Sequence, residues 1–249
     1  MKLKLLVIFC IGSLCVSAQQ RIDTDRPDQT ESALTVPKKY FQGEFGFAKE
    51  NFHNENFNLI YPAFLLKYGI SKKAELRMEG NFLSQYIHLI ADTKTTTLLE
   101  PVEIGTKISL FEEKGMRPKT SLIVHLGLPF TASQYDKEQH FFPSFRFTCQ
   151  HSLSSTIGLG YNVGAEWDGY DSKPAWLYTF SPNFNIGKRW YAYVEAFGFI
   201  ERNFSEHNLD GGIAYYISND TKVDFSSGFG IGSSALKNYL NLGFSFRLH

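Results

Sequence analysis

Apolar and polar residues alternate along most of the chain after residue 40, which is the pattern of β-strands with one apolar face. The stretch from Tyr239 to His249 (YLNLGFSFRLH) shows this alternation most clearly. One face of it carries Leu240, Leu242, Phe244, Phe246 and Leu248, while the other face carries polar or small residues. We predict a strand there whose apolar face meets lipid, because a transmembrane β-barrel turns apolar side chains outward.

The same alternation predicts about twelve strands along the chain. They cover residues 40–52, 57–70, 73–84, 99–111, 119–129, 141–152, 155–167, 174–186, 189–200, 207–218, 221–231 and 239–249. Most connections between them are alternately short, such as 71–73, and long, such as 84–97, as in barrels with short periplasmic turns and longer outer loops. We therefore predict an all-β, transmembrane, antiparallel up-and-down barrel. A soluble sandwich also alternates and is the alternative.

The start of the chain predicts export. Lys2 and Lys4 precede an apolar run, and small residues precede a cleavage point after Ala18, as in a secretory signal peptide. The expected organisation is a signal peptide at 1–18, a leader at 19–39 that is periplasmic or folded into the lumen, and a barrel at 40–249. The expected location is the outer membrane of a Gram-negative-type bacterium.

Composition narrows the classes of partner. Cys10 and Cys15 would leave with the signal peptide, so Cys149 would remain alone and no intrachain disulfide could form. The 25 basic and 25 acidic residues balance and form no basic patch, so we expect no nucleic acid partner. Aromatic residues make up 16% of a chain whose mean hydropathy is −0.21, which fits strands with a single apolar face.

Residues 22–47 read IDTDRPDQTESALTVPKKYFQGEFGF. This opening resembles that of the outer-membrane family named for the MetA pathway of phenol degradation. The matching residues are Thr24, Asp25, Arg26, Pro27, Asp28, Thr30, Glu31, Ser32, Val36 and Pro37. The opening motif is fairly specific, whereas the rest of the resemblance is a diffuse hairpin pattern. It implies an outer-membrane barrel of a family described as transporters, without a substrate.

The leader is polar, charged and without periodicity, and it precedes the first strand, so it would begin in the periplasm. One interpretation is a solvated segment. The other, which the resemblance favours, is a partial plug that folds into or across the barrel mouth and pairs its charges with lumen charges. Its candidate residues are Thr24, Asp25, Arg26, Pro27, Asp28, Thr30 and Glu31.

Charged residues on the predicted strands fall mainly on the inward face. They are Glu44, Glu75, Arg77, Glu79, Glu103, Lys107, Arg146, Glu166, Glu195, Asp210, Lys222, Asp224 and Arg247. Charges cannot face lipid cheaply, so this placement follows from the fold alone. Two interpretations remain: an ion-pair network that fills a narrow barrel, or a hydrated passage with a mild preference for cations, since acidic groups outnumber basic ones.

Catalytic motifs are absent from the sequence. His151 and Ser152 are the nearest candidates for lipid hydrolysis, but adjacent strand residues point to opposite faces. No H-E-x-x-H spacing is present. We expect no enzyme, no metal and no cofactor.

The leading functional hypothesis is a monomeric barrel that carries a small solute passively across the outer membrane, an aromatic or apolar solute being one option. The alternative is a closed structural or interaction barrel, and the remote alternative is an outer-membrane lipid hydrolase. Expected partners are outer-membrane lipid and the barrel-assembly machinery. Asn241, Gly243, Phe246 and Leu248 match the spacing of an assembly signal in the last strand.

Overall fold

The computed structural model describes residues 21–249, except 90–91, 135, 203 and 233. The predicted signal peptide lies outside the described residues. Within them the alternating runs form thirteen strands: β1 (Phe41–Phe52), β2 (Phe57–Gly69), β3 (Ala74–His88), β4 (Thr93–Leu99), β5 (Val102–Phe111), β6 (Lys119–Leu128), β7 (Phe142–Ser152), β8 (Ile157–Glu166), β9 (Ala175–Ile186), β10 (Trp190–Ile200), β11 (Ser205–Tyr216), β12 (Thr221–Ile231) and β13 (Leu236–Leu248).

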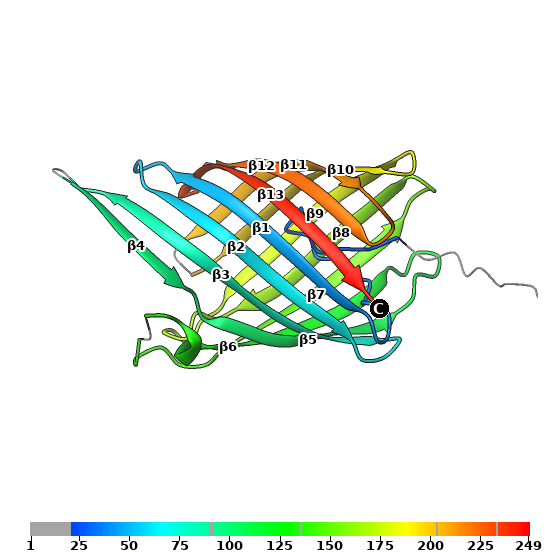
Figure 1. The fold of residues 1–249 in the computed structure, drawn as a ribbon, viewed down its shortest axis with the longest axis horizontal. Coiled ribbons are helices and arrows are strands. Elements are labelled where there is room, and N and C mark those ends of the chain that lie inside the picture. Colours follow the sequence, from blue (N-terminus) through cyan, green and yellow to red (C-terminus); the bar gives the residue numbers. More distant parts are fainter. Residues whose placement is uncertain (1–20, 90–91, 135, 203, 233) are drawn as a thin grey trace, which may run out of the picture.

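The strands are tilted and close into an antiparallel barrel (Figure 1). The seam lies between β1 and β13, where Phe41 pairs with Leu248 and Phe45 with Phe244. β4 pairs only with the outer part of β3, whereas β5 pairs with both β3 and β6. Twelve of the described strands therefore close the barrel, which confirms the predicted fold class.

The prediction of a loop at 84–97 is wrong. β3 continues to His88, and β4 returns beside it to form a hairpin that projects beyond the barrel wall (Figure 1). The prediction relied on an alternating apolar face, and threonine-rich β4 has none, although threonine favours strands. Pro101 then separates β4 from β5, as expected for a residue that cannot donate to a strand ladder.

Most of the predicted short turns lie at one end of the barrel. The turns between β2 and β3, β7 and β8, β9 and β10, and β11 and β12 are all found there, together with the end of β13 (Figure 1). The turn between β5 and β6 is longer, as its sequence indicated. Because short turns are expected on the periplasmic side of such barrels, we call this end the periplasmic end and the other the outer end.

The outward face of the barrel wall is apolar, and its inward face is polar and charged. Leu240, Leu242 and Leu248 on β13 are 53%, 59% and 56% exposed, while Ser245 and Arg247 on the same strand are buried. Exposed apolar side chains in a continuous band fit a surface that lipid covers. The interior is instead lined by charged and polar side chains, many of them buried.

Helical structure is minimal. A short 3-10 helix, η1 (Pro129–Thr131), lies between β6 and β7. Among the described residues, no helix has the length and apolarity needed to cross a membrane.

Candidate functional site

The leader lies in the lumen of the barrel, entering from the periplasmic end (dark blue in Figure 1). The N–H of Ile22 donates to the carbonyl of Asn219, in the turn before β12, at 2.7 Å. At its other end, the N–H of Lys39 donates to the carbonyl of Gly69, the last residue of β2, also at 2.7 Å. The described part of the leader is therefore a loop with both ends fixed near the periplasmic end.

Three cations converge on one leader carboxylate, in what we call the Asp25 cluster (Asp25, Lys67, Arg77 and Lys107). Asp25 Oδ2 lies 2.8 Å from Lys67 Nζ and 2.9 Å from Arg77 Nη1, and Asp25 Oδ1 lies 2.8 Å from Lys107 Nζ. The four side chains are at most 5% exposed. Buried charges are tolerated only when paired, so each partner depends on the others.

Further carboxylates link this cluster to the wall and the leader. Glu31 Oε2 of the leader lies 2.7 Å from Arg77 Nη2, and Glu31 Oε1 lies 3.6 Å from Arg146 Nη1. On the wall, Glu75 pairs with Arg77 at 3.1 Å, and Glu44 pairs with Lys67. The leader thus joins an ion-pair network that spans β1, β2, β3, β5 and β7.

The opposite wall holds the backbone of the leader. Glu195 on β10 accepts hydrogen bonds from the N–H groups of Gln29 and Thr30, both at 2.7 Å. Asn162 on β8 accepts one from the N–H of Glu31 at 2.7 Å. An irregular segment inside a barrel has no strand ladder to satisfy its N–H groups, so wall side chains take that role.

The remaining predicted leader residues also contact the wall. Arg26 Nη2 lies 3.2 Å from Asp224 Oδ1 and donates to Asn241 Oδ1 at 2.9 Å. The other leader residues accept hydrogen bonds from the wall. Tyr193 OH donates to the carbonyl of Pro27, and Lys222 Nζ donates to Thr24 Oγ1. Asp28 Oδ2 accepts from both Ser181 Oγ and Tyr191 OH.

Two glycines leave room for the Arg26 side chain. A Cβ on Gly46 of β1 would collide with the guanidinium of Arg26, and a Cβ on Gly243 of β13 would collide with Asp224 and crowd Arg26. Gly243, predicted as part of the assembly signal, therefore also has a packing reason to be glycine.

Replacing Gly46 by valine should therefore loosen the leader without altering any charge. Overpacking of this kind costs about 1–3 kcal/mol, so amide hydrogen exchange across 22–37 should accelerate roughly tenfold. Exchange mass spectrometry on the refolded barrel measures this. In an Arg26→Ala background the same valine should add little, because the collision partner is gone. An equal effect in both backgrounds would contradict this role of Gly46.

Lys67 is a lumen residue that sequence reasoning missed. β2 carries apolar residues on both faces, so its register could not be assigned from alternation. Lys67 is 3% exposed, within ion-pair distance of both Asp25 and Glu44. Its charge near the end of a strand that is otherwise almost entirely apolar was the available signal.

Open space lies on the outer side of the leader. Two cavities of about 520 and 650 Å³ share Glu79, Glu103, Phe142, Arg146, Glu166 and Asp168 in their walls. Glu31 lines the first, and Arg26 and Gln29 line the second. The leader is therefore the floor of this outer vestibule.

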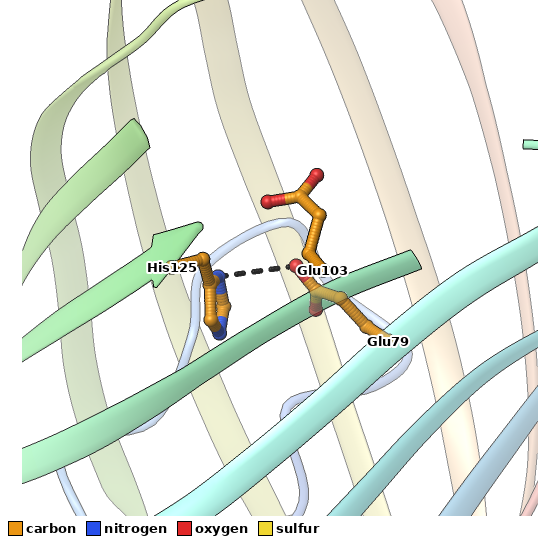
Figure 2. Close-up of side chains that lie close together, drawn as sticks. All are labelled: Glu79, Glu103 and His125. Carbon is orange, nitrogen blue, oxygen red and sulfur yellow. Dashed lines mark ion pairs between the residues drawn. The ribbon is translucent and has the colours of Figure 1, made fainter. Parts of the chain in front are cut away.

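Glu79, Glu103 and His125 gather in the vestibule wall, with possible ligand atoms all within 4.8 Å of one another (Figure 2). His125 Nδ1 lies 3.1 Å from Glu79 Oε1, and Arg77 Nε donates to His125 Nε2 at 3.1 Å. Because Nε2 accepts from Arg77, Nδ1 must carry the proton and donate to Glu79. A metal at Nδ1 would move that proton to Nε2, opposite the Arg77 donor. The arrangement thus suits a hydrogen-bond relay better than a metal centre.

Comparison with known proteins shows that this barrel has the fold of outer-membrane channels. An outer membrane channel from Pseudomonas putida F1 is similar over 87% of this chain and 98% of its own, with 9% identity and a TM-score of 0.68. The KdgM porin, solved in complex with oligogalacturonate, is similar over 83% of this chain and 99% of its own, with 8% identity and a TM-score of 0.54. The transport unit of the Escherichia coli autotransporter AIDA-I is similar over 84% and 89%, with 10% identity and a TM-score of 0.52.

These identities establish the fold alone. No curated protein matches the sequence. Residues 24–248, however, match the family described as "Putative MetA-pathway of phenol degradation". The match begins at Thr24, so it includes the leader. The chain therefore belongs to this family and is a β-barrel with the fold of outer-membrane channels.

Proposed function

We propose that the protein is a gated passive channel for small solutes, in which residues 22–37 of the leader form a plug. The observation that supports this most directly is the leader's position as the floor of an open vestibule. A solute entering from outside would meet Glu31, Arg26 and Gln29 before the periplasmic end. Passage then requires the leader to move.

The kind of contact that the leader makes supports a removable plug. It forms side-chain hydrogen bonds and ion pairs with the wall, as at Glu195 and Arg77, and no part of it belongs to the described strands. Contacts of this kind can break without disrupting the strand ladder. The barrel itself, closed by backbone pairing from β1 to β13, can stay intact while the leader leaves.

A reversible crosslink tests the plug. Thr30 Oγ1 and Thr179 Oγ1 on β9 lie 2.6 Å apart, so cysteines at both positions should form a disulfide. Cys149 is changed to serine to leave only this pair. We expect the oxidised barrel to be silent in a planar bilayer and the reduced barrel to conduct, with a difference of roughly tenfold or more.

The Thr30→Cys variant with Cys149→Ser, under the same oxidant, is the control and should respond like the reduced barrel. Equal conductance in the oxidised and reduced double variant would contradict the plug. Silence of every variant, including the reduced one, would favour the closed structural barrel instead.

We further propose that the barrel works without catalysis, as a monomer whose partners are membrane lipid and the assembly machinery. His151 lies against Tyr161 (Nε2 to OH, 3.4 Å), and both His151 Nδ1 (4.0 Å) and the N–H of Ser152 (2.8 Å) approach Glu113 Oε1. In the described part of the chain no hydrogen bond joins His151 to Ser152, which argues against a joint role in lipid hydrolysis. Asn241, Gly243, Phe246 and Leu248 remain the proposed recognition site for the assembly machinery.

A further inference from the structure

We infer that Lys67, Arg77 and Lys107 form a carboxylate-binding site in the passage. While the leader is in place, the carboxylate of Asp25 occupies the position that the carboxylate of the solute would take. The solute class that this site fits is a small organic anion with one carboxylate. The inference rests on the proposed channel, because the site becomes accessible only when the leader moves.

The site is built by the barrel wall rather than by the leader. Its three cations come from neighbouring strands β2, β3 and β5, and they approach both carboxylate oxygens of Asp25 at 2.8–2.9 Å. Lys107 Nζ also donates to the carbonyl of Ser32 at 2.9 Å. Charge-assisted contacts of this length are the strong ones, and Arg77 supplies a planar donor group suited to a carboxylate.

The wall would keep the site in shape without Asp25. Glu75 holds Arg77 Nη1 at 3.1 Å, His125 accepts from Arg77 Nε at 3.1 Å, and Glu44 pairs with Lys67. Donors fixed by neighbouring groups lose little freedom when a ligand binds. Without the leader the wall therefore presents an ordered site.

Charge balance also points to an anion. The three wall cations that contact Asp25 (Lys67, Arg77 and Lys107) face two wall carboxylates (Glu44 and Glu75), which is one positive charge in excess. The leader's Glu31, which also pairs with Arg77, is balanced by a fourth wall cation, Arg146. Asp25 supplies the missing negative charge while the leader is in place. Because an unpaired buried cation is strongly unfavourable, displacement of Asp25 favours entry of another carboxylate.

The vestibule limits how much negative charge the solute can carry. Arg146 lines both cavities and lies 3.6 Å from Glu31, so it connects the open space to the Asp25 cluster. Glu103 and Glu166 line the same cavities and would repel a polyanion. A solute with a single carboxylate fits both features.

Asp25 competes with the solute at a high effective concentration, because a short tether keeps it near the site. An external carboxylate should therefore bind weakly to the wild-type barrel and more tightly once Asp25 is removed. We propose a full-length Asp25→Ala variant, with acetate as the probe at fixed ionic strength, measured by titration calorimetry in detergent. Its dissociation constant for acetate should fall at least roughly tenfold below that of wild type.

Two further variants make this test specific. Asp28→Ala removes a carboxylate of the same leader that hydrogen-bonds to Ser181 and Tyr191 and lies outside the Asp25 cluster, and it should bind acetate no better than wild type. Lys107→Gln added to Asp25→Ala should cancel the gain. Asp25→Asn, which keeps the shape of the side chain, replaces Asp25→Ala if that variant does not show the heat-modifiable migration of a folded barrel.

Equal acetate binding by the Asp25 and Asp28 variants would overturn the inference, as would a gain that survives Lys107→Gln. The two proposals fail separately. If the crosslinked leader has no effect on conductance but Asp25→Ala gains acetate binding, the site stands and the gated channel falls. If conductance follows the crosslink and acetate binding does not change, the channel stands and the carboxylate site falls.

Discussion

An Arg77→Met variant is expected to unfold with about 3–5 kcal/mol less free energy than the wild-type barrel and to hold its leader loosely. Arg77 pairs with Asp25, Glu31 and Glu75 and also donates to His125. Methionine fills similar space but leaves these buried carboxylates without their shared partner. Denaturant unfolding in liposomes gives the free energy, and hydrogen exchange across 22–37 reports the leader.

Arg117→Met is the matched control for Arg77. Arg117 lies exposed in the turn between β5 and β6, with its guanidinium 5.5 Å from the ring centre of Phe111. The same substitution there should change the free energy of unfolding by no more than about 0.5 kcal/mol. If Arg77→Met cost no more than this control, the lumen network would not be what holds the leader.

A Leu242→Arg variant is expected to lose about 2–4 kcal/mol of unfolding free energy. Leu242 lies at the middle of β13, opposite Phe47 on β1 and Phe225 on β12, and is 59% exposed on the outward face. An arginine at that depth would have to sit in hydrocarbon. Equilibrium unfolding in lipid vesicles measures the loss.

Ile217→Arg provides the comparison for depth. Ile217 is 51% exposed and follows β11 at the periplasmic end. Arginine near a membrane interface costs only about 0–1 kcal/mol. Equal losses at Leu242 and Ile217 would mean that the outward face does not cross a bilayer.

Strand alternation was sufficient to predict the barrel because lipid and lumen impose opposite demands on neighbouring residues. That reasoning worked for β13, where Leu242 and Ser245 face opposite sides. It failed for strands on which lipid and lumen do not impose opposite requirements. β4 lies beyond the barrel wall, where no apolar face is required, so the pattern predicted a loop there. β2 carries apolar residues on both faces, so the pattern could not show that Lys67 faces the lumen.

The contacts of the leader could not have been predicted from local sequence. Asp25 is separated from Lys67, Arg77 and Lys107 by 42, 52 and 82 residues, and only closure of the barrel brings them together. The charges of the leader indicated that it could pair with the lumen. Which cation meets which carboxylate depends on strand register and tilt, which the alternation pattern does not contain.

Both ends of the leader are attached near the periplasmic end, so the force needed to remove the leader depends on the direction in which it acts. A pull on the chain before Ile22 would load the contacts in sequence, beginning with those of Arg21 to Lys188 and Asn185 and the hydrogen bond from Ile22 to Asn219. A push from the vestibule would instead load the contacts of Asp25, Glu31 and Thr30 together. Bonds broken one at a time yield to a smaller force than bonds that share a load. The leader should therefore peel away easily toward the periplasm and resist pressure from outside.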